Sequence, residues 1–160
     1  MAVPERPLRA GEILKELVRG GVEFVVVGGV AVQTHGYIRG TRDVDVVPSP
    51  SPTNGKRLSK VLSALAAVEV GRDAHLVRFN TRDGRLDVLR LDETAGRPTS
   101  FDDLRSRALV VDLEGIQIPV AGLDDLIRMK RAAGRPHDLT DIGALTRDDE
   151  ELEREAREST

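Results

Sequence analysis

Residues 22–47 have the sequence VEFVVVGGVAVQTHGYIRGTRDVDVV, which combines two apolar segments with a pair of glycines and a pair of aspartates. The first segment, residues 22–27, is rich in valine and ends at Gly28-Gly29, so it predicts a buried strand that a turn follows. In the second, residues 43–47, aspartate and valine alternate until Pro48. Since side chains alternate across a strand, Asp43 and Asp45 are expected to point to the same face.

Two carboxylates side by side repel each other unless a cation lies between them. Magnesium prefers oxygen ligands and is commonly held by carboxylates together with phosphate oxygens. A third carboxylate is expected on an adjacent strand, and Asp87 is the candidate because it is the acidic residue inside an otherwise apolar segment. The glycines Gly28 and Gly29 would let the backbone approach the phosphates of a nucleotide closely. This pattern predicts a metal centre beside a triphosphate site.

The rest of the chain predicts helices interspersed with strands. Helical spacing of apolar residues covers residues 8–18, 55–67 and 123–133, one or two helical turns are expected at 30–35, and Ser100 is a candidate N-cap for a helix at 100–107. Further strands are expected at 75–79 and 85–91, joined by an Asp83-Gly84 turn, and at 109–113 and 116–120, joined at Glu114-Gly115. A last helix should begin at residue 136. Together these elements predict an α/β (α+β) fold with a mixed, twisted sheet of about four to five strands flanked by helices.

Composition narrows the possible functions. A chain of 160 residues fits one domain, which we expect at residues 1–146, and residues 147–160 form a charged C-terminal tail. With 24 basic and 27 acidic residues the formal net charge is -3, unlike a general nucleic-acid coat protein. The absence of cysteine excludes disulfides, thiolate zinc sites and a cysteine nucleophile. No signal peptide or membrane span is recognisable, so a cytoplasmic location without membrane contact is expected.

Several motifs resemble those of the DNA polymerase beta-like nucleotidyltransferase superfamily. They are Gly28-Gly29, the segment RGTRDVDV at residues 39–46, and Asp87 in a later strand. A downstream segment, MKRAAGRPHDLTDI at residues 129–142, makes the chain similar to small nucleotidyltransferase-like proteins related to the toxin component of abortive-infection and type IV toxin-antitoxin systems. The resemblance covers most of the chain, with its blocks in the expected order.

The resemblance implies a nucleotidyltransferase fold and a metal-dependent enzyme. Such an enzyme moves a nucleoside monophosphate from a nucleoside triphosphate to an acceptor hydroxyl and releases pyrophosphate. Asp43, Asp45 and Asp87 would be the catalytic and metal-binding residues, with Mg²⁺ or Mn²⁺ as the ion. The nucleotide-binding residues would be Gly28, Gly29, Arg39, Thr41, Arg42 and Lys130. The acceptor could be RNA such as a tRNA end, a partner protein or a small molecule, and a cognate toxin or antitoxin is a further possible partner.

Other interpretations of the same residues stay open. Gly28-Gly29 could be a simple turn, and Asp43 and Asp45 could belong to a solvated strand face. Asp87 could serve only as an ion-pair partner of Arg85 or Arg78. Lys130, on an amphipathic helix, could be a solvated lysine. The alternative function is a catalytically idle antitoxin or regulatory binding module of the same fold.

Overall fold

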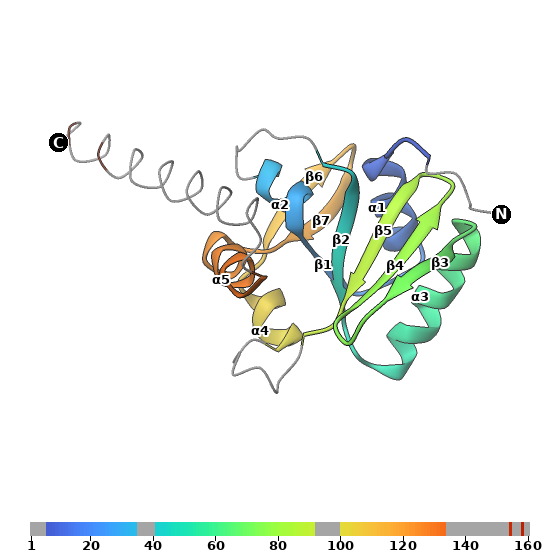
Figure 1. Ribbon diagram of the computed structural model, residues 1–160. Helices are drawn as coiled ribbons and strands as arrows, with labels where there is room; N and C mark the ends of the chain where they lie inside the picture. The colour runs from blue at the N-terminus through green and yellow to red at the C-terminus, as the bar shows by residue number, and fades with distance from the viewer. Residues whose placement is uncertain (1–5, 35–40, 92–99, 134–153, 155–157, 159–160) are drawn as a thin grey trace.

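The computed structural model describes residues 6–34, 41–91, 100–133, 154 and 158 of the chain. Helices and strands are interspersed along it, as the sequence predicts (Figure 1). In chain order the elements are α1 (Ala10–Arg19), β1 (Phe24–Val27), α2 (Gly28–Thr34), β2 (Asp43–Pro48), α3 (Pro52–Ala64), β3 (Val68–Arg72), β4 (Leu76–Thr81), β5 (Gly84–Leu89), α4 (Phe101–Ser106), β6 (Leu109–Leu113), β7 (Ile116–Val120) and α5 (Leu123–Ala133).

One mixed sheet forms the centre of the described structure, with the strand order β3-β4-β5-β2-β1-β7-β6. Strand β2 pairs antiparallel with β1 and parallel with β5, and β1 pairs parallel with β7. The predicted α/β class is therefore confirmed. The expected four to five strands were too few, because the described residues form seven.

Part of this difference comes from β3, an edge strand that the sequence analysis did not predict. Its side chains are all exposed, including Val68 at 45% and Val70 at 47%. A strand without a buried face lacks the apolar periodicity on which strand prediction depends. The alternation of Val68, Glu69 and Val70 was the available signal, and it is too short to distinguish a strand from a loop.

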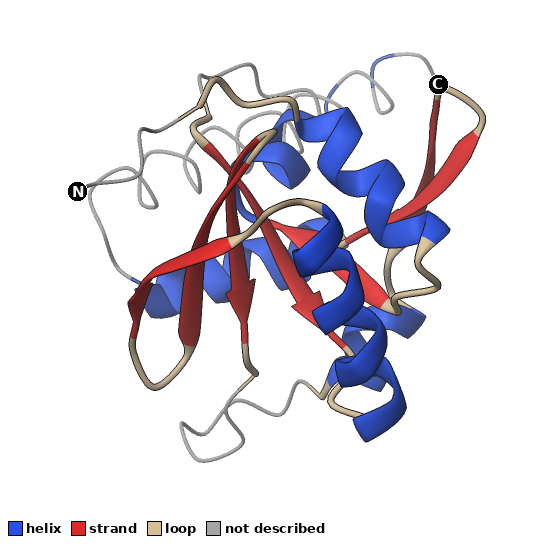
Figure 2. Cartoon of the chain, turned by 90° about the vertical axis from the view of Figure 1, so that its right-hand side faces the viewer, coloured by secondary structure: helices blue, strands red, loops and turns tan. Residues whose placement is uncertain are grey.

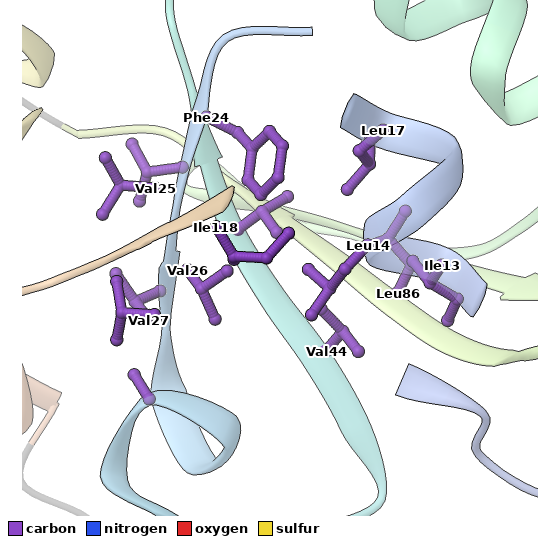
Figure 3. Packing of buried hydrophobic residues seen from close by; sticks show 14 of the residues in the cluster. Ile13, Leu14, Leu17, Phe24, Val25, Val26, Val27, Val44, Leu86 and Ile118 are labelled. Carbon is purple, nitrogen blue, oxygen red and sulfur yellow. The ribbon is translucent and has the colours of Figure 1, made fainter. Parts of the chain in front are cut away.

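Helices cover both faces of the sheet, and the valines of β1 divide between them. Helix α1 contacts β2, β5, β7 and α3, whereas α2 and α4 contact β1. Figure 2 shows helices on both faces of the sheet. Figure 3 shows Phe24 and Val26 on the side of Leu14 and Leu17, while Val25 points to the other side. All of these side chains are at most 3% exposed. Burial on both faces explains why β1 is apolar without alternation.

Local signals set several element boundaries. Ser51 accepts a hydrogen bond from Asn54 N at 3.2 Å and Pro52 occupies the first turn, so α3 begins before the predicted residue 55. Ser100 is the N-cap of α4, as predicted, and forms a reciprocal capping box with Asp103.

Both predicted hairpins are present, with β4–β5 closing where Thr81 pairs with Gly84 and β6–β7 turning at Glu114-Gly115. The helix predicted from residue 136 lies outside the described residues. So does the charged tail, residues 147–160, apart from single positions.

Candidate active site

Strand β2 presents Asp43 and Asp45 on one face of the sheet. The two carboxylates are partly exposed, while Val44 and Val46 between and after them are fully buried on the opposite face. This alternation follows from the pleat of the strand, which the Asp-Val-Asp-Val pattern matches residue by residue. The core anchors the strand through its valines, so the positions of the two carboxylates are set by core packing.

Strand β5 brings Asp87 beside them. In the parallel β2–β5 pair Asp45 lies in register with Asp87, and Asp43 with Arg85. Asp87 is only 3% exposed. One carboxylate oxygen from each of Asp43, Asp45 and Asp87 lies within 4.8 Å of the others. The structure thus brings together the three aspartates that the sequence analysis selected, and we call them the triad.

Gly28 lies against the triad at the junction of β1 and α2. Its φ is +70°, a conformation that side-chain-bearing residues rarely adopt. A Cβ atom at this position would lie 2.7 Å from Asp45 Cγ and 2.9 Å from Asp45 Cβ. The first glycine of the pair is therefore required for the close approach of the Asp45 carboxyl group, a role that the sequence analysis did not foresee. Gly29 follows as a buried residue in α2.

Two arginines on the same sheet face pair with the triad. Arg78 Nε donates to Asp87 Oδ1 at 3.2 Å, and Arg78 Nη2 donates to Asp87 Oδ2 at 3.4 Å. Arg85 Nη2 donates to Asp43 Oδ2, and Arg85 Nε lies 3.7 Å from Asp87 Oδ1. The ion pairs considered as an alternative role for Asp87 are thus present. They coexist with the clustering of the three carboxylates.

Burial dominates the protonation of Asp87. Desolvation raises the pKa of its carboxyl group above the ordinary value of 3.8, and the negative charge of Asp43 acts in the same direction. The hydrogen bonds from Arg78 and the charges of Arg78 and Arg85 lower the pKa, but the net direction is upward. The fold therefore holds this carboxylate at an energetic cost that a further cation at the triad would reduce.

The donor set of the triad fits a divalent cation such as magnesium. All three side chains offer carboxylate oxygens, the ligand type that Mg²⁺ and Mn²⁺ favour. The fold also makes room for the cluster, since Gly28 provides the space that the Asp45 carboxyl group occupies.

The predicted nucleotide-binding residues have different positions. Thr41 precedes β2 and its Oγ1 donates to Asp43 O at 3.1 Å, next to the triad, and Arg42 is exposed beside it. Lys130 is part of α5, a helix in contact with α2, but its side chain lies outside the described residues. Arg39 also lies outside them.

Comparison with known proteins decides the family. A model described as "Nucleotidyltransferase of unknown function (DUF6036)" matches residues 10–147. The chain belongs to this nucleotidyltransferase family. A comparison with curated proteins finds no match.

Solved nucleotidyltransferase structures share the fold of this DUF6036 protein. The lincosamide antibiotic adenylyltransferase LnuA, bound to lincomycin, aligns with a TM-score of 0.64 and 16% identity over 88% of this chain and 98% of its own. ANT(2″)-Ia in complex with adenylyl-2″-tobramycin aligns with a TM-score of 0.61 and 12% identity over 85% and 84% of the two chains. An antigenic nucleotidyltransferase-like protein from Paracoccidioides brasiliensis aligns with a TM-score of 0.62 and 16% identity over 88% of this chain and 78% of its own. At these identities the likeness establishes the fold.

The fold and family confirm the predicted class of enzyme, a nucleotidyltransferase. Among the described residues of this DUF6036 protein no helix is long and apolar enough to cross a membrane. The roles of the individual site residues, the metal, the acceptor and a toxin-antitoxin partner stay predictions.

Proposed function

We propose that this protein transfers a nucleoside monophosphate from a nucleoside triphosphate to an acceptor hydroxyl, with release of pyrophosphate, and that the transfer requires Mg²⁺ or Mn²⁺. The observation that carries the proposal is the convergence of Asp43, Asp45 and Asp87, with one carboxylate oxygen of each within 4.8 Å of the others. Membership in a nucleotidyltransferase family supports the reaction class.

Asp43 and Asp45 would hold the metal together with Asp87. When bound, the ion would supply charge neutralisation to the phosphates and activation of the attacking hydroxyl. The chain contributes the positions of these ligands. Because Val44 and Val46 are fully buried, the two carboxylates of β2 are held without depending on a flexible loop.

Asp87 would also accept the proton of the acceptor hydroxyl. Burial raises the pKa of the Asp87 carboxyl group, so this pKa lies closer to neutral pH than the pKa of an exposed aspartate does. In the structure, Arg78 donates to both oxygens of the Asp87 carboxylate.

The nucleotide would lie at the junction of β1 and α2. Gly28 and Gly29 would approach the phosphates through the backbone, and Thr41 and Arg42, which precede β2, adjoin the triad residue Asp43. We propose Arg39 and Lys130 as further contacts to the nucleotide on the basis of the sequence pattern. Among the described residues, Gly28 lies against Asp45 and Thr41 bonds to the Asp43 backbone, from two different segments of the chain.

The acceptor is best sought first among small molecules that carry a hydroxyl group. Both LnuA, a lincosamide antibiotic adenylyltransferase, and ANT(2″)-Ia, seen with adenylyl-2″-tobramycin, share the fold over at least 84% of each chain. The net charge of -3 and the low aromatic content of 2% also favour a small molecule or a partner protein over an RNA end such as that of tRNA.

The decisive experiment is calorimetric titration of each of the four nucleoside triphosphates with and without magnesium. The titrations compare the wild type with the double variant Asp43→Asn, Asp45→Asn. Binding that needs the metal and is lost in the variant supports the transferase site. A radiolabelled α-phosphate then reports transfer to candidate acceptors. No nucleotide binding under any condition refutes the proposal.

A catalytically idle binding module, such as an antitoxin or regulator, is the second candidate function. The observation that favours it is the pairing of Arg78 with Asp87 and of Arg85 with Asp43, which balances part of the triad charge without a metal. Such a module would bind no magnesium nucleotide, and Asp45→Asn would leave its partner binding unchanged. A cognate toxin or antitoxin would then be the partner to identify by co-purification.

We further propose that residues 1–146 form the nucleotidyltransferase unit and residues 147–160 a charged tail. The family match ends at residue 147, which supports this boundary. Because nucleoside triphosphates and magnesium are supplied inside cells, the proposal includes a cytoplasmic location.

A further inference from the structure

Arg78 contacts the atoms that the proposed metal would require. It lies directly opposite Asp87 in the antiparallel β4–β5 pair, so both side chains project from the same sheet face. Its guanidinium donates to Asp87 Oδ1 at 3.2 Å and to Asp87 Oδ2 at 3.4 Å. Both oxygens of this carboxylate are therefore engaged by one cationic side chain.

A second arginine–aspartate pair, Arg107 with Asp125, lies outside the triad and has shorter hydrogen bonds than the pair of Arg78 with Asp87. Arg107 donates to the two carboxylate oxygens of Asp125 at 2.9 and 3.0 Å, and Arg128 adds a third bond at 2.9 Å. Asp125 and Asp87 are equally buried, at 2% and 3% exposure. Charge-assisted bonds of this type are commonly about 2.7–2.9 Å long. The Arg78 bonds are longer, so they hold the carboxylate less strongly than the Arg107 bonds do.

The two arginines at the triad also differ from each other. Arg85 has a side chain that is 21% exposed and bonds to Asp43 while it lies 3.7 Å from Asp87 Oδ1. The Arg78 side chain is 37% exposed. Arg78 is therefore the arginine that can turn towards solvent or a bound anion with the smaller loss of packing.

Charge makes the two arginines competitors of a metal ion. Two guanidinium groups beside three carboxylates leave a formal charge of about one negative unit at the triad. A divalent cation that approaches the triad gains attraction from the carboxylates but is repelled by both arginines. Any movement of Arg78 from Asp87 towards another anion removes part of this repulsion and frees two ligand atoms.

We propose that Arg78 competes with the divalent cation for the Asp87 carboxylate, so that the metal binds weakly to the protein alone and more strongly when the phosphates of a nucleotide engage the Arg78 guanidinium. The inference rests on the proposed function. Arg78 is in this view a positioning residue that makes metal binding depend on the nucleotide.

The test measures Mn²⁺ binding without nucleotide, by calorimetry, in the wild type, Arg78→Lys and Arg78→Gln. Removal of the charge in Arg78→Gln should tighten Mn²⁺ binding by roughly threefold to tenfold, the range expected for a partly exposed ion pair. Arg78→Lys keeps the charge but loses the two-bond geometry, so its affinity should lie between the other two. A second titration uses the nucleoside triphosphate that the wild type binds most tightly, as its magnesium complex. The affinity of Arg78→Gln for this complex should be lower than that of the wild type by threefold or more.

Opposite changes in the two affinities distinguish competition from a merely structural role, which would weaken both. The matched control is Arg107→Gln, which removes the same guanidinium from a buried aspartate outside the triad. It should lower the melting temperature and leave Mn²⁺ affinity unchanged.

If the wild type binds Mn²⁺ and nucleotide but neither Arg78 variant binds Mn²⁺ more tightly, the competition is refuted and the transferase proposal stands. If the wild type binds neither Mn²⁺ nor nucleotide, both are refuted.

Discussion

The carboxyl group of Asp45 occupies the space in which a side chain at Gly28 would begin. A Cβ at residue 28 would lie 2.7 Å from Asp45 Cγ, and the φ of +70° at Gly28 disfavours any other residue type. Two residues separated in sequence by residues 29–44 are thereby fixed against each other at the proposed catalytic centre.

Gly28→Ala should therefore remove activity and destabilise the protein. A positive φ costs an alanine about 1–2 kcal/mol, and displacement of Asp45 adds to this, so the melting temperature should fall by roughly 4–10 °C. Nucleotidyl transfer should fall by at least about 100-fold, since small displacements at a reacting centre have effects of this size. Thermal denaturation and a transfer assay check the two effects.

The matched control for Gly28→Ala is Gly55→Ala. Gly55 is exposed in α3 and a Cβ there would meet nothing within 4 Å. This variant should gain about 0.5–1 kcal/mol of stability, because alanine favours the helix, and keep full activity. Normal activity of Gly28→Ala would show that the contact with Asp45 has no functional importance.

Asp45→Asn should abolish metal-dependent nucleotide binding while the fold stays intact. The change keeps the shape of the side chain and removes one negative charge from a metal ligand, so transfer should fall by about 100-fold or more. EDTA should have the same effect on the wild type, and added Mg²⁺ should restore it. Titration calorimetry and circular dichroism are the measurements. Undiminished transfer in the variant or in EDTA would contradict metal dependence.

Asp87→Asn should stabilise the metal-free protein although it inactivates the enzyme. The folded-state pKa of Asp87 is raised, so the ionised form is disfavoured by folding at neutral pH and a neutral isostere relieves this. We expect a rise in melting temperature in EDTA at pH 7, measured by thermal denaturation of the wild type and the variant.

The pH dependence provides a check on the Asp87 prediction. As the pH falls towards the ordinary value of 3.8, wild-type Asp87 becomes protonated in the folded state before it does so in the unfolded state. The stability advantage of Asp87→Asn in EDTA should therefore shrink as the pH is lowered. An advantage that stays constant or grows would mean that desolvation of the charge is not its cause.

Asn54 connects α3 to the residue before β1 and to the residue after β2. Its replacement should be among the more destabilising single changes. Its Nδ2 donates to Glu23 O and to Ser49 O at 2.9 Å, and its Oδ1 accepts from Glu23 N at 2.7 Å. Asn54 is only 2% exposed. Asn54→Ala would leave these buried backbone groups without hydrogen-bond partners, which should lower the free energy of unfolding by about 2–4 kcal/mol. Chemical denaturation measures the loss, with the exposed Thr53→Ala as control. Equal stability of the two variants would contradict the prediction.

Local patterns in the sequence predicted much of the site before the fold was known. The alternation of Asp43, Val44, Asp45 and Val46 predicted a strand with two carboxylates on one face, because the pleat of a strand has a period of two residues. The cap at Ser100 and the hairpin at Glu114-Gly115 follow from equally local backbone chemistry. The exposed strand β3, with no buried face, produced no such pattern.

The sequence by itself determined six of the seven described strands, most of the helices and the selection of Asp43, Asp45 and Asp87. Only the tertiary structure decided that Asp87 lies in register with Asp45 and that Gly28 makes room for Asp45. These relationships depend on which strands become neighbours in the sheet. The physical reason is that strand pairing and its register are set by burial of the apolar face of the whole sheet, a sum over distant segments that no single stretch of sequence contains.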